Sequence, residues 1–222
     1  IRLEVAHFGA APLREIWPLF KFVDDRGRTF LADHAPAREI RIGNGQVLGE
    51  IHPDFSALPA PAHYRLVVGL AQTPEGKAVV CENDWDIWVY PAQQEAELPR
   101  DVRLVHEWNS EARAHLQAGG TVLWCIPPAA VAPDPKLGKV GLGFSSIFWN
   151  TAWTHRQEPQ TLGILCDPKH PLFASFPTEN HSDWQWWYLF RQDGALILDG
   201  LPRELRPTVQ VIDDWFTGRK RG

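Results

Sequence analysis

The first 91 residues contain about seven short strand-like segments, with no helical period between them. The clearest are residues 2–5, which alternate polar and apolar side chains, and the longer run 63–70. Turn residues (Asp, Asn, Pro and Gly) separate segments at 24–27, 43–45 and 73–76. The other strand-like segments are residues 15–22, 28–31, 40–42, 77–81 and 85–90. Short strands at this spacing predict an all-β, immunoglobulin-like β-sandwich over residues 1–91, without the disulfide that many such domains carry.

A polar, acidic stretch bounded by Pro91 and Pro99 marks a change in composition, so residues 92–100 are interpreted as a linker. Beyond it, residues 102–105 predict a short strand and residues 110–118 a helix with Ser110 as its N-cap. Gly119 and Gly120 end that helix, and a largely apolar strand follows at 121–126. A helix, a Gly-Gly stop and a buried strand form half of a parallel α/β unit, so residues 101–222 predict a small α/β domain.

Later segments of the second domain have strand character at 161–166, 195–198 and 209–212. The chain ends soon after the last of them, so we expect this domain to be truncated at its C-terminus. The chain also begins at Ile1 and contains no methionine, which leads us to expect a processed chain or an excised piece of a longer protein.

Composition excludes some classes of function. The net charge of −5 argues against nucleic-acid binding, because that binding depends on Lys and Arg neutralising phosphates. No run of eighteen apolar residues is present, so no membrane-spanning helix is expected. Cys81, Cys125 and Cys166 are an odd number of cysteines at wide spacing with apolar neighbours, and we interpret them as buried free thiols.

Motifs for catalysis and cofactor binding are incomplete. The Gly-x-Ser-x-Gly elbow of α/β-hydrolases is absent, and residues 141–146 are one residue short of a dinucleotide-binding fingerprint. Cys166, Asp167, His170 and His181 fall within sixteen positions, but they lack the close ligand pairs of a zinc site. We therefore assign no catalytic residue, no metal site and no cofactor.

Two carboxylates invite comparison with glycosidases, which flank the scissile bond with a pair of Asp or Glu residues. Glu107 and Glu179 both have aromatic neighbours in the sequence, but spacing alone does not bring them together. Glu107 fits a position just before the helix at 110–118 equally well.

Aromatic density is the strongest remaining signal, since eight of the eleven tryptophans follow residue 100. The rings could pack the core of the second domain, or they could form exposed platforms for sugar rings. For the second interpretation the densest run supplies the rings, and the polar residues beside it supply hydrogen-bonding partners. The candidate carbohydrate-binding residues are Trp184, Trp186, Trp187, Glu179, His181, Asp183, Trp149 and Asn150.

Several of these stretches together resemble the C-terminal region of large bacterial glycoside hydrolase family 2 proteins, described as β-galactosidase-like or sugar-binding. The resemblance covers nearly the whole chain. The matching stretches are residues 7–9, 49–51, 83–91, 148–151, 161–171, 176–179, 181–187, 205–207 and 211–216.

The resemblance implies that the first domain is an immunoglobulin-like accessory sandwich, and that the second is a degenerate, non-catalytic relative of the class I glutamine amidotransferase fold. In family 2 enzymes the catalytic residues lie in an upstream barrel, where an Asn-Glu pair carries the acid/base glutamate. This chain has no Asn-Glu dipeptide, so the resemblance brings no catalytic residue with it.

We therefore expect a non-catalytic accessory part of a family 2-like glycosidase, with a structural or sugar-contacting role. Its expected partners are carbohydrate and the remaining domains of the parent enzyme, and a homo-oligomer stays open. The family resemblance slightly favours a periplasmic or secreted protein. The alternatives are a stand-alone carbohydrate-binding module and an oligomerisation or interaction module.

Overall fold

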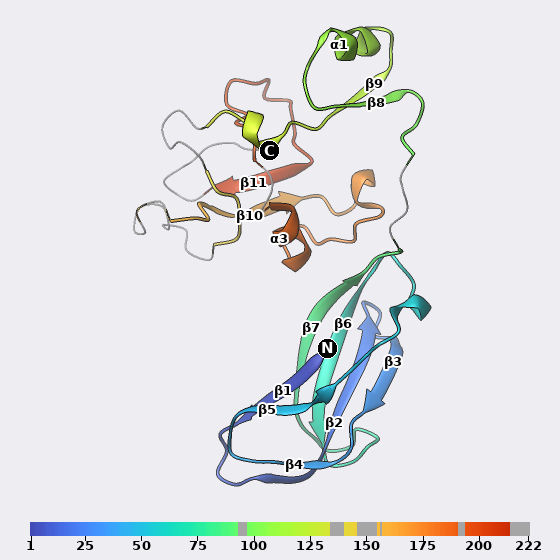
Figure 1. Cartoon of the computed structure of the whole chain (residues 1–222), viewed down its shortest axis with the longest axis vertical. Helices are drawn as coiled ribbons and strands as arrows, with labels where there is room; N and C mark the ends of the chain where they lie inside the picture. The colour runs from blue at the N-terminus through green and yellow to red at the C-terminus, as the bar shows by residue number, and fades with distance from the viewer. Residues whose placement is uncertain (93–96, 134–139, 146–154, 156, 191–193, 214–222) are drawn as a thin grey trace. The chain divides into compact units, whose positions relative to one another are not determined.

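Alternating apolar side chains build two antiparallel sheets in the N-terminal part of the chain (Figure 1). The structure is a computed structural model, and it describes residues 1–92, 97–133, 140–145, 155, 157–190 and 194–213. The chain divides into two compact units, Ile1–Gln93 and Gln94–Gly222, which are described separately.

The first unit consists of seven strands and one 3-10 turn. The strands are β1 (Arg2–His7), β2 (Leu13–Asp24), β3 (Thr29–His34), β4 (Arg38–Ile40), β5 (Gly43–Glu50), β6 (Ala62–Ala71) and β7 (Val79–Val89), and the turn η1 spans Phe55–Ala57. The larger sheet has the order β3-β2-β6-β7, with β4 also paired to β2, and the smaller sheet is the pair β1-β5. All pairs are antiparallel.

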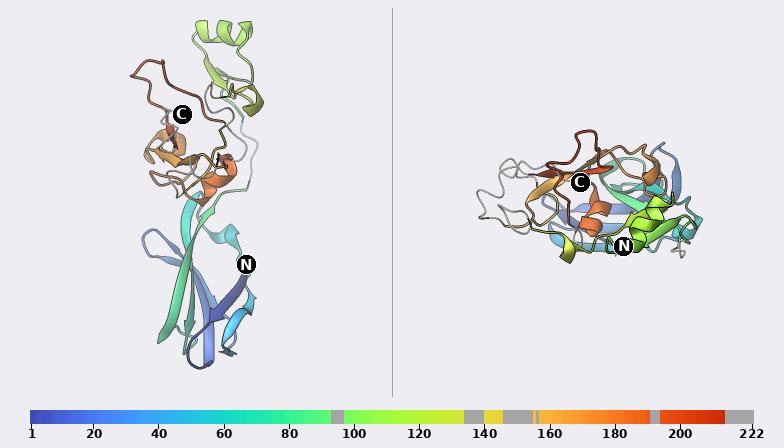
Figure 2. Two further views of the ribbon diagram at one scale, coloured as in Figure 1. Left: turned by 90° about the vertical axis from the view of Figure 1, so that its left-hand side faces the viewer. Right: turned by 90° about the horizontal axis from the view of Figure 1, so that it is seen from above.

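Both sheets contribute to one apolar core, which makes the first unit an all-β sandwich. Leu3 of β1 and Leu48 of β5 pack in the same cluster as Phe22 of β2 and Leu66 of β6. Figure 2 shows the two layers from a second direction. Successive side chains of a strand point to opposite faces of a sheet. Every second residue of the larger sheet therefore points away from this core, to the outer face.

Tyr64 closes one end of this core and is only 1% exposed. Its hydroxyl donates a hydrogen bond of 2.7 Å to the Pro59 carbonyl, five residues upstream. Its ring meets Phe30 edge to face at 5.5 Å and packs in a cluster with Leu58 and Val89. The phenol therefore ties the start of β6 to the segment that precedes it.

In the described part of the second unit the strands form two two-stranded sheets. β8 (Val102–Val105) and β9 (Thr121–Trp124) are parallel and connected through helix α1 (Ser110–Gln117). β10 (Thr161–Cys166) and β11 (Val209–Asp213) are antiparallel. Among the described residues these pairs do not join into one parallel sheet, so the predicted α/β class of this unit stays a prediction.

The other elements that the structure describes in the second unit are helical. They are η2 (Pro128–Ala130), η3 (Pro171–Phe173) and the helix α3 (Trp184–Phe190). In the part of the chain that the structure describes, no helix is long and apolar enough to cross a bilayer.

Two details of the sequence analysis are wrong in this unit. The N-cap of α1 is Asn109, whose side chain accepts from the Ala112 N–H at 2.9 Å, and Ser110 is already the first helical residue. Residues 195–198 were predicted as a strand, but only Ile197 forms an isolated bridge there. A short apolar run without a long partner strand does not specify an extended segment.

We predict that Tyr64→Phe destabilises the first unit by about 1 kcal/mol, because the hydrogen bond from the buried tyrosine to the Pro59 carbonyl is lost. Urea denaturation of the full chain followed by circular dichroism measures this. Tyr188→Phe is the control, since that side chain is 73% exposed, and we expect it to change stability by less than about 0.5 kcal/mol. Equal stability of Tyr64→Phe and the wild type would contradict the prediction.

Candidate functional site

Helix α3 divides the tryptophan run between the core and the surface. Trp186 is 5% exposed and packs against Phe176, with ring centroids 5.0 Å apart, and against Phe173 at 5.9 Å. Its indole N–H donates to the Thr178 hydroxyl at 2.8 Å. Both faces of this contact, the ring and its N–H, are therefore used within the protein. The prediction that Trp186 binds sugar is wrong, because Trp186 is a core residue.

The opposite side of α3 carries exposed rings. Trp184 is 77% exposed and Tyr188 is 73% exposed, whereas Trp187 is 38% exposed and meets Phe144 edge to face at 5.6 Å. Residues three and four apart lie on the same side of a helix, so these three aromatic residues share one surface. We call Trp184, Trp187 and Tyr188 the aromatic face of α3.

The polar candidates beside this helix differ in their availability. His181 and Glu179 are both exposed, and they form an ion-pair contact of 3.2 Å between Nε2 and Oε2. Asp183 is half-buried, and its carboxylate accepts from the Gln185 backbone N–H and side-chain amide, both at 3.1 Å. Burial raises the pKa of Asp183 above its ordinary value, although the hydrogen bonds from Gln185 act against this. Asp183 therefore orders the start of α3, while Glu179 and His181 remain accessible to a ligand.

Other predicted residues do not extend the site. Trp149 and Asn150 lie outside the described residues. Glu107 is exposed in the loop between β8 and α1. Among the described residues, no group of three or more His, Cys, Asp or Glu side chains is arranged to hold a metal ion.

A cavity of about 420 Å³ lies where β10 and β11 meet the loop that precedes β11. Cys166, Asp167, His170 and Arg206 supply its polar lining. The Nδ1 atom of His170 accepts from the Leu172 N–H at 3.2 Å, which leaves Nε2 as the protonated nitrogen of the neutral ring. The cavity thus offers hydrogen-bond donors from both His170 and Arg206.

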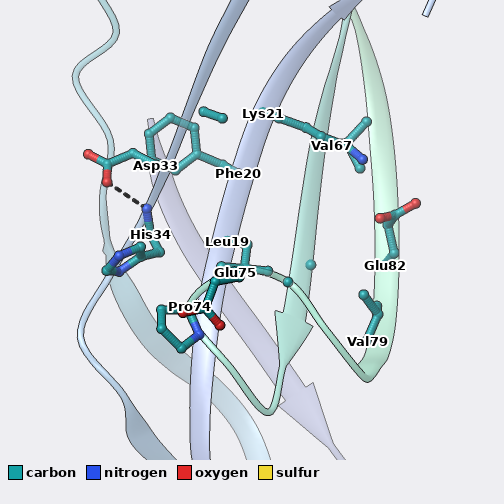
Figure 3. A pocket seen from close by; sticks show the side chains of 13 residues that line it. Leu19, Phe20, Lys21, Asp33, His34, Val67, Pro74, Glu75, Val79 and Glu82 are labelled. Carbon is teal, nitrogen blue, oxygen red and sulfur yellow. Dashed lines mark hydrogen bonds between the residues drawn. The ribbon is translucent and has the colours of Figure 1, made fainter. Parts of the chain in front are cut away.

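A second cavity, of about 380 Å³, lies on the outer face of the larger sheet in the first unit (Figure 3). Leu19 and Val67 line its apolar part, while Lys21 and Glu82 project from different strands (Figure 3). The β6–β7 turn forms one wall, because a Cβ on Gly76 would lie 3.2 Å from Leu19. Its volume is in the range of small-molecule sites. No sequence pattern indicated this cavity, because its lining residues come from four strands and a turn.

The cysteines differ from the sequence prediction. Cys81 and Cys125 are exposed and Cys166 is half-buried, so the prediction of three buried thiols is wrong. The Cys166 thiol donates to the Glu179 carbonyl at 3.2 Å. Burial, together with the negative charges of Asp183 and Asp167, raises the pKa of Cys166.

We predict that iodoacetamide alkylates Cys81 and Cys125 first and Cys166 last at pH 8, because alkylation requires an accessible thiolate. Since its pKa is raised, Cys166 should need a higher pH than an ordinary thiol to reach its full rate. Peptide mass spectrometry over a time course at several pH values measures the three rates. Fast labelling of Cys166 at pH 8 would contradict both the half-burial of this thiol and its raised pKa.

Comparison with known proteins finds one matching family model in each part of the chain. Residues 1–91 match a family model described as Domain of unknown function (DUF8488). Residues 103–222 match a family model described as Domain of unknown function (DUF8487). A search of the curated proteins finds no match. Since the second model covers more than half of the sequence, the chain belongs to the DUF8487 family.

Proposed function

We propose that this chain is an accessory, carbohydrate-contacting part of a family 2-like glycosidase. The observation that carries the proposal is the exposure of Trp184 and Tyr188, at 77% and 73%, on one side of α3. Large aromatic side chains that water surrounds leave apolar area uncovered, and the apolar face of a sugar ring can cover it. The neighbouring Glu179 and His181 supply exposed groups that can bond to sugar hydroxyls.

In this proposal the chain itself does not cleave glycosides. The sequence resemblance supports a non-catalytic role, because the matched region of family 2 proteins is an accessory one. The chain also lacks the Asn-Glu pair of the catalytic barrel. Glycosidic cleavage needs two carboxyl groups about 5–10 Å apart across the bond. Glu179 instead pairs with His181, and Asp183 is engaged by Gln185.

For the first unit we propose an immunoglobulin-like arrangement. The pair β1-β5 facing a sheet of order β3-β2-β6-β7 supports it, since immunoglobulin-like sandwiches combine a sheet of this kind with a smaller partner sheet. The bond from Tyr64 to Pro59 supports it further, because such domains carry a tyrosine near the start of a late strand that bonds to the backbone just upstream. Leu66 stands two residues later, where antibody domains carry a cysteine.

For the second unit we propose a degenerate amidotransferase-like α/β domain. The support is the parallel pair β8-β9 joined through α1, since parallel neighbours need a crossover of this kind. The antiparallel pair β10-β11 would then be a departure from an all-parallel sheet. An experimental structure of the full chain tests whether the two sheets join.

We predict that Trp184→Ala weakens binding of soluble oligosaccharides about fivefold, because one stacking platform contributes on the order of 1 kcal/mol. Isothermal titration with cello-, xylo- and galacto-oligosaccharides measures the change. The full chain should also leave aryl-glycosides unhydrolysed over the same period.

Trp85→Ala is the matched control, because Trp85 is also exposed, at 49%, but belongs to the first unit. Tyr188→Phe keeps an aromatic ring on α3 and should retain most of the affinity. Equal losses in Trp184→Ala and Trp85→Ala, or no binding of any oligosaccharide by the wild type, would refute the proposed role of α3. Turnover of an aryl-glycoside that is lost in Glu179→Gln would refute the accessory role.

A further inference from the structure

Strand β7 forms one border of the larger sheet. Its eleven residues, Val79–Val89, pair with β6 along one side, from Val79 opposite Ala71 to Val89 opposite Ala62. No described strand pairs with its other side, and Figure 1 shows β7 at the border beside β6. In an antiparallel strand, alternate residues direct both N–H and C=O away from the existing partner. β7 therefore offers a row of backbone donors and acceptors to another strand.

The sequence of β7 carries only part of the usual protection of an edge strand. Natural edges are shortened or carry charged side chains, above all lysine, or proline or bulges, which prevent further pairing. The acidic residues of β7 protect it in this way against a like-charged strand, but not against a basic one. β7 is about twice the common strand length and contains no Lys, Arg, Pro or Gly. Its one register shift falls at its first residues, between Leu70 and Ala71 of the partner strand. The rest of the edge is regular and open.

The two faces of β7 have different chemistry. Glu82, Asp84 and Asp86 stand at alternate positions and face the outer side of the sheet. The intervening residues Cys81 and Trp85 face the core side, but both are exposed, Trp85 by 49%. The core cluster draws its buried residues from other strands, so β7 is covered on neither face at this point.

The acidic row already has cationic neighbours on its β6 side. His63 lies 2.9 Å from Asp86, and Arg65 lies 3.9 Å from Asp84. Burial alone would lower the pKa of His63, but the carboxylates of Asp25 and Asp86, which both contact its ring, raise it above the ordinary value. Glu82 has no ion-pair or hydrogen-bond partner within the described parts of the chain. A strand added on the open side would meet the same row of negative charge.

This charge pattern disfavours a second copy of the chain as the occupant. An antiparallel pair of two β7 strands centred on Asp84 places Asp84 opposite its own copy and Glu82 opposite Asp86. Like charges directly opposite one another destabilise a pair of strands. A strand with Lys or Arg at alternate positions instead places opposite charges across the pair, which stabilises it.

We propose that β7 is a docking edge for an extended segment of another protein, with Lys or Arg at alternate positions on one face and apolar residues on the other. The backbone of the segment would continue the larger sheet beyond β7. Its basic face would meet Glu82, Asp84 and Asp86, and its apolar face would cover Trp85. This proposal is independent of the carbohydrate role of α3.

The native cysteines provide the test. Cys81 lies on β7, whereas Cys125 is also exposed but belongs to the second unit. The probe is an acetylated, amidated seven-residue peptide in which valine and lysine alternate, added to the full chain. At a peptide concentration about ten times Kd, the free fraction of sites falls to about one tenth, so alkylation of Cys81 should slow about tenfold. The rate at Cys125 should stay unchanged.

Three comparisons separate strand addition from nonspecific attraction. A peptide with proline at its central position lacks one backbone donor and should protect Cys81 much less. A peptide with glutamate in place of lysine should not bind. The charge-reversal variant Asp84→Lys should lose affinity for the lysine peptide and gain affinity for the glutamate peptide, which also shows that the variant is folded.

Several results would overturn the proposal. They are an unchanged Cys81 rate in the wild type at millimolar lysine peptide, equal protection by the proline peptide, and equal protection of Cys125. Protection of Cys81 that rises with protein concentration alone, with a dimer in light scattering, would assign the edge to a second copy instead.

Discussion

The antiparallel ladder between β2 and β6 is the interaction on which the first unit depends. It runs without interruption from Trp17 opposite Ala71 to Asp24 opposite Tyr64. β2 pairs with β3 and β4 on its other side, and β6 pairs with β7 on its other side. One register therefore determines which side chains of three further strands face the core, because a shift of one residue would turn every side chain to the opposite face.

The same register explains the features on the outer face of the sheet. With Phe22 and Leu66 directed into the core, Leu19, Lys21 and Val67 are directed outward and line the cavity of Figure 3. Since β6 is already paired to β2, its remaining side can bind only β7, and β7 becomes the border. Of the residues of β7, Ile87 packs against the core cluster, but Trp85 is not part of it and stays 49% exposed.

Sequence patterns predicted the elements that have strong local signals. Residues 102–105, 110–118 and 161–166 correspond to β8, α1 and β10, because a cap, a Gly-Gly stop or a compact apolar run defines each of them. Prediction failed where context overrides composition. Residues 77–81 and 85–90 were separated at Asn83 and Asp84, residues of low strand propensity, yet they form the single strand β7. Polar residues fit a border strand that water reaches on both faces, and the same exposure explains why Cys81 is not buried.

The sequence identified the tryptophan run as the candidate site, but it did not predict which rings are buried and which are exposed. That distinction follows from the helical periodicity of α3. Trp186 and Phe190 are four residues apart and buried, while Trp184 and Tyr188 are four apart and exposed. A helix of seven residues is too short to be stable alone, so burial of the first pair against Phe173 and Phe176 must hold it in place. The exposed pair therefore depends on the buried one: the core contacts fix the orientation of α3 and so present Trp184 and Tyr188 together as one surface. Because the helix is held before binding, a ligand such as a sugar has to order only the two side chains and not the backbone that carries them, which lowers the entropy cost of binding.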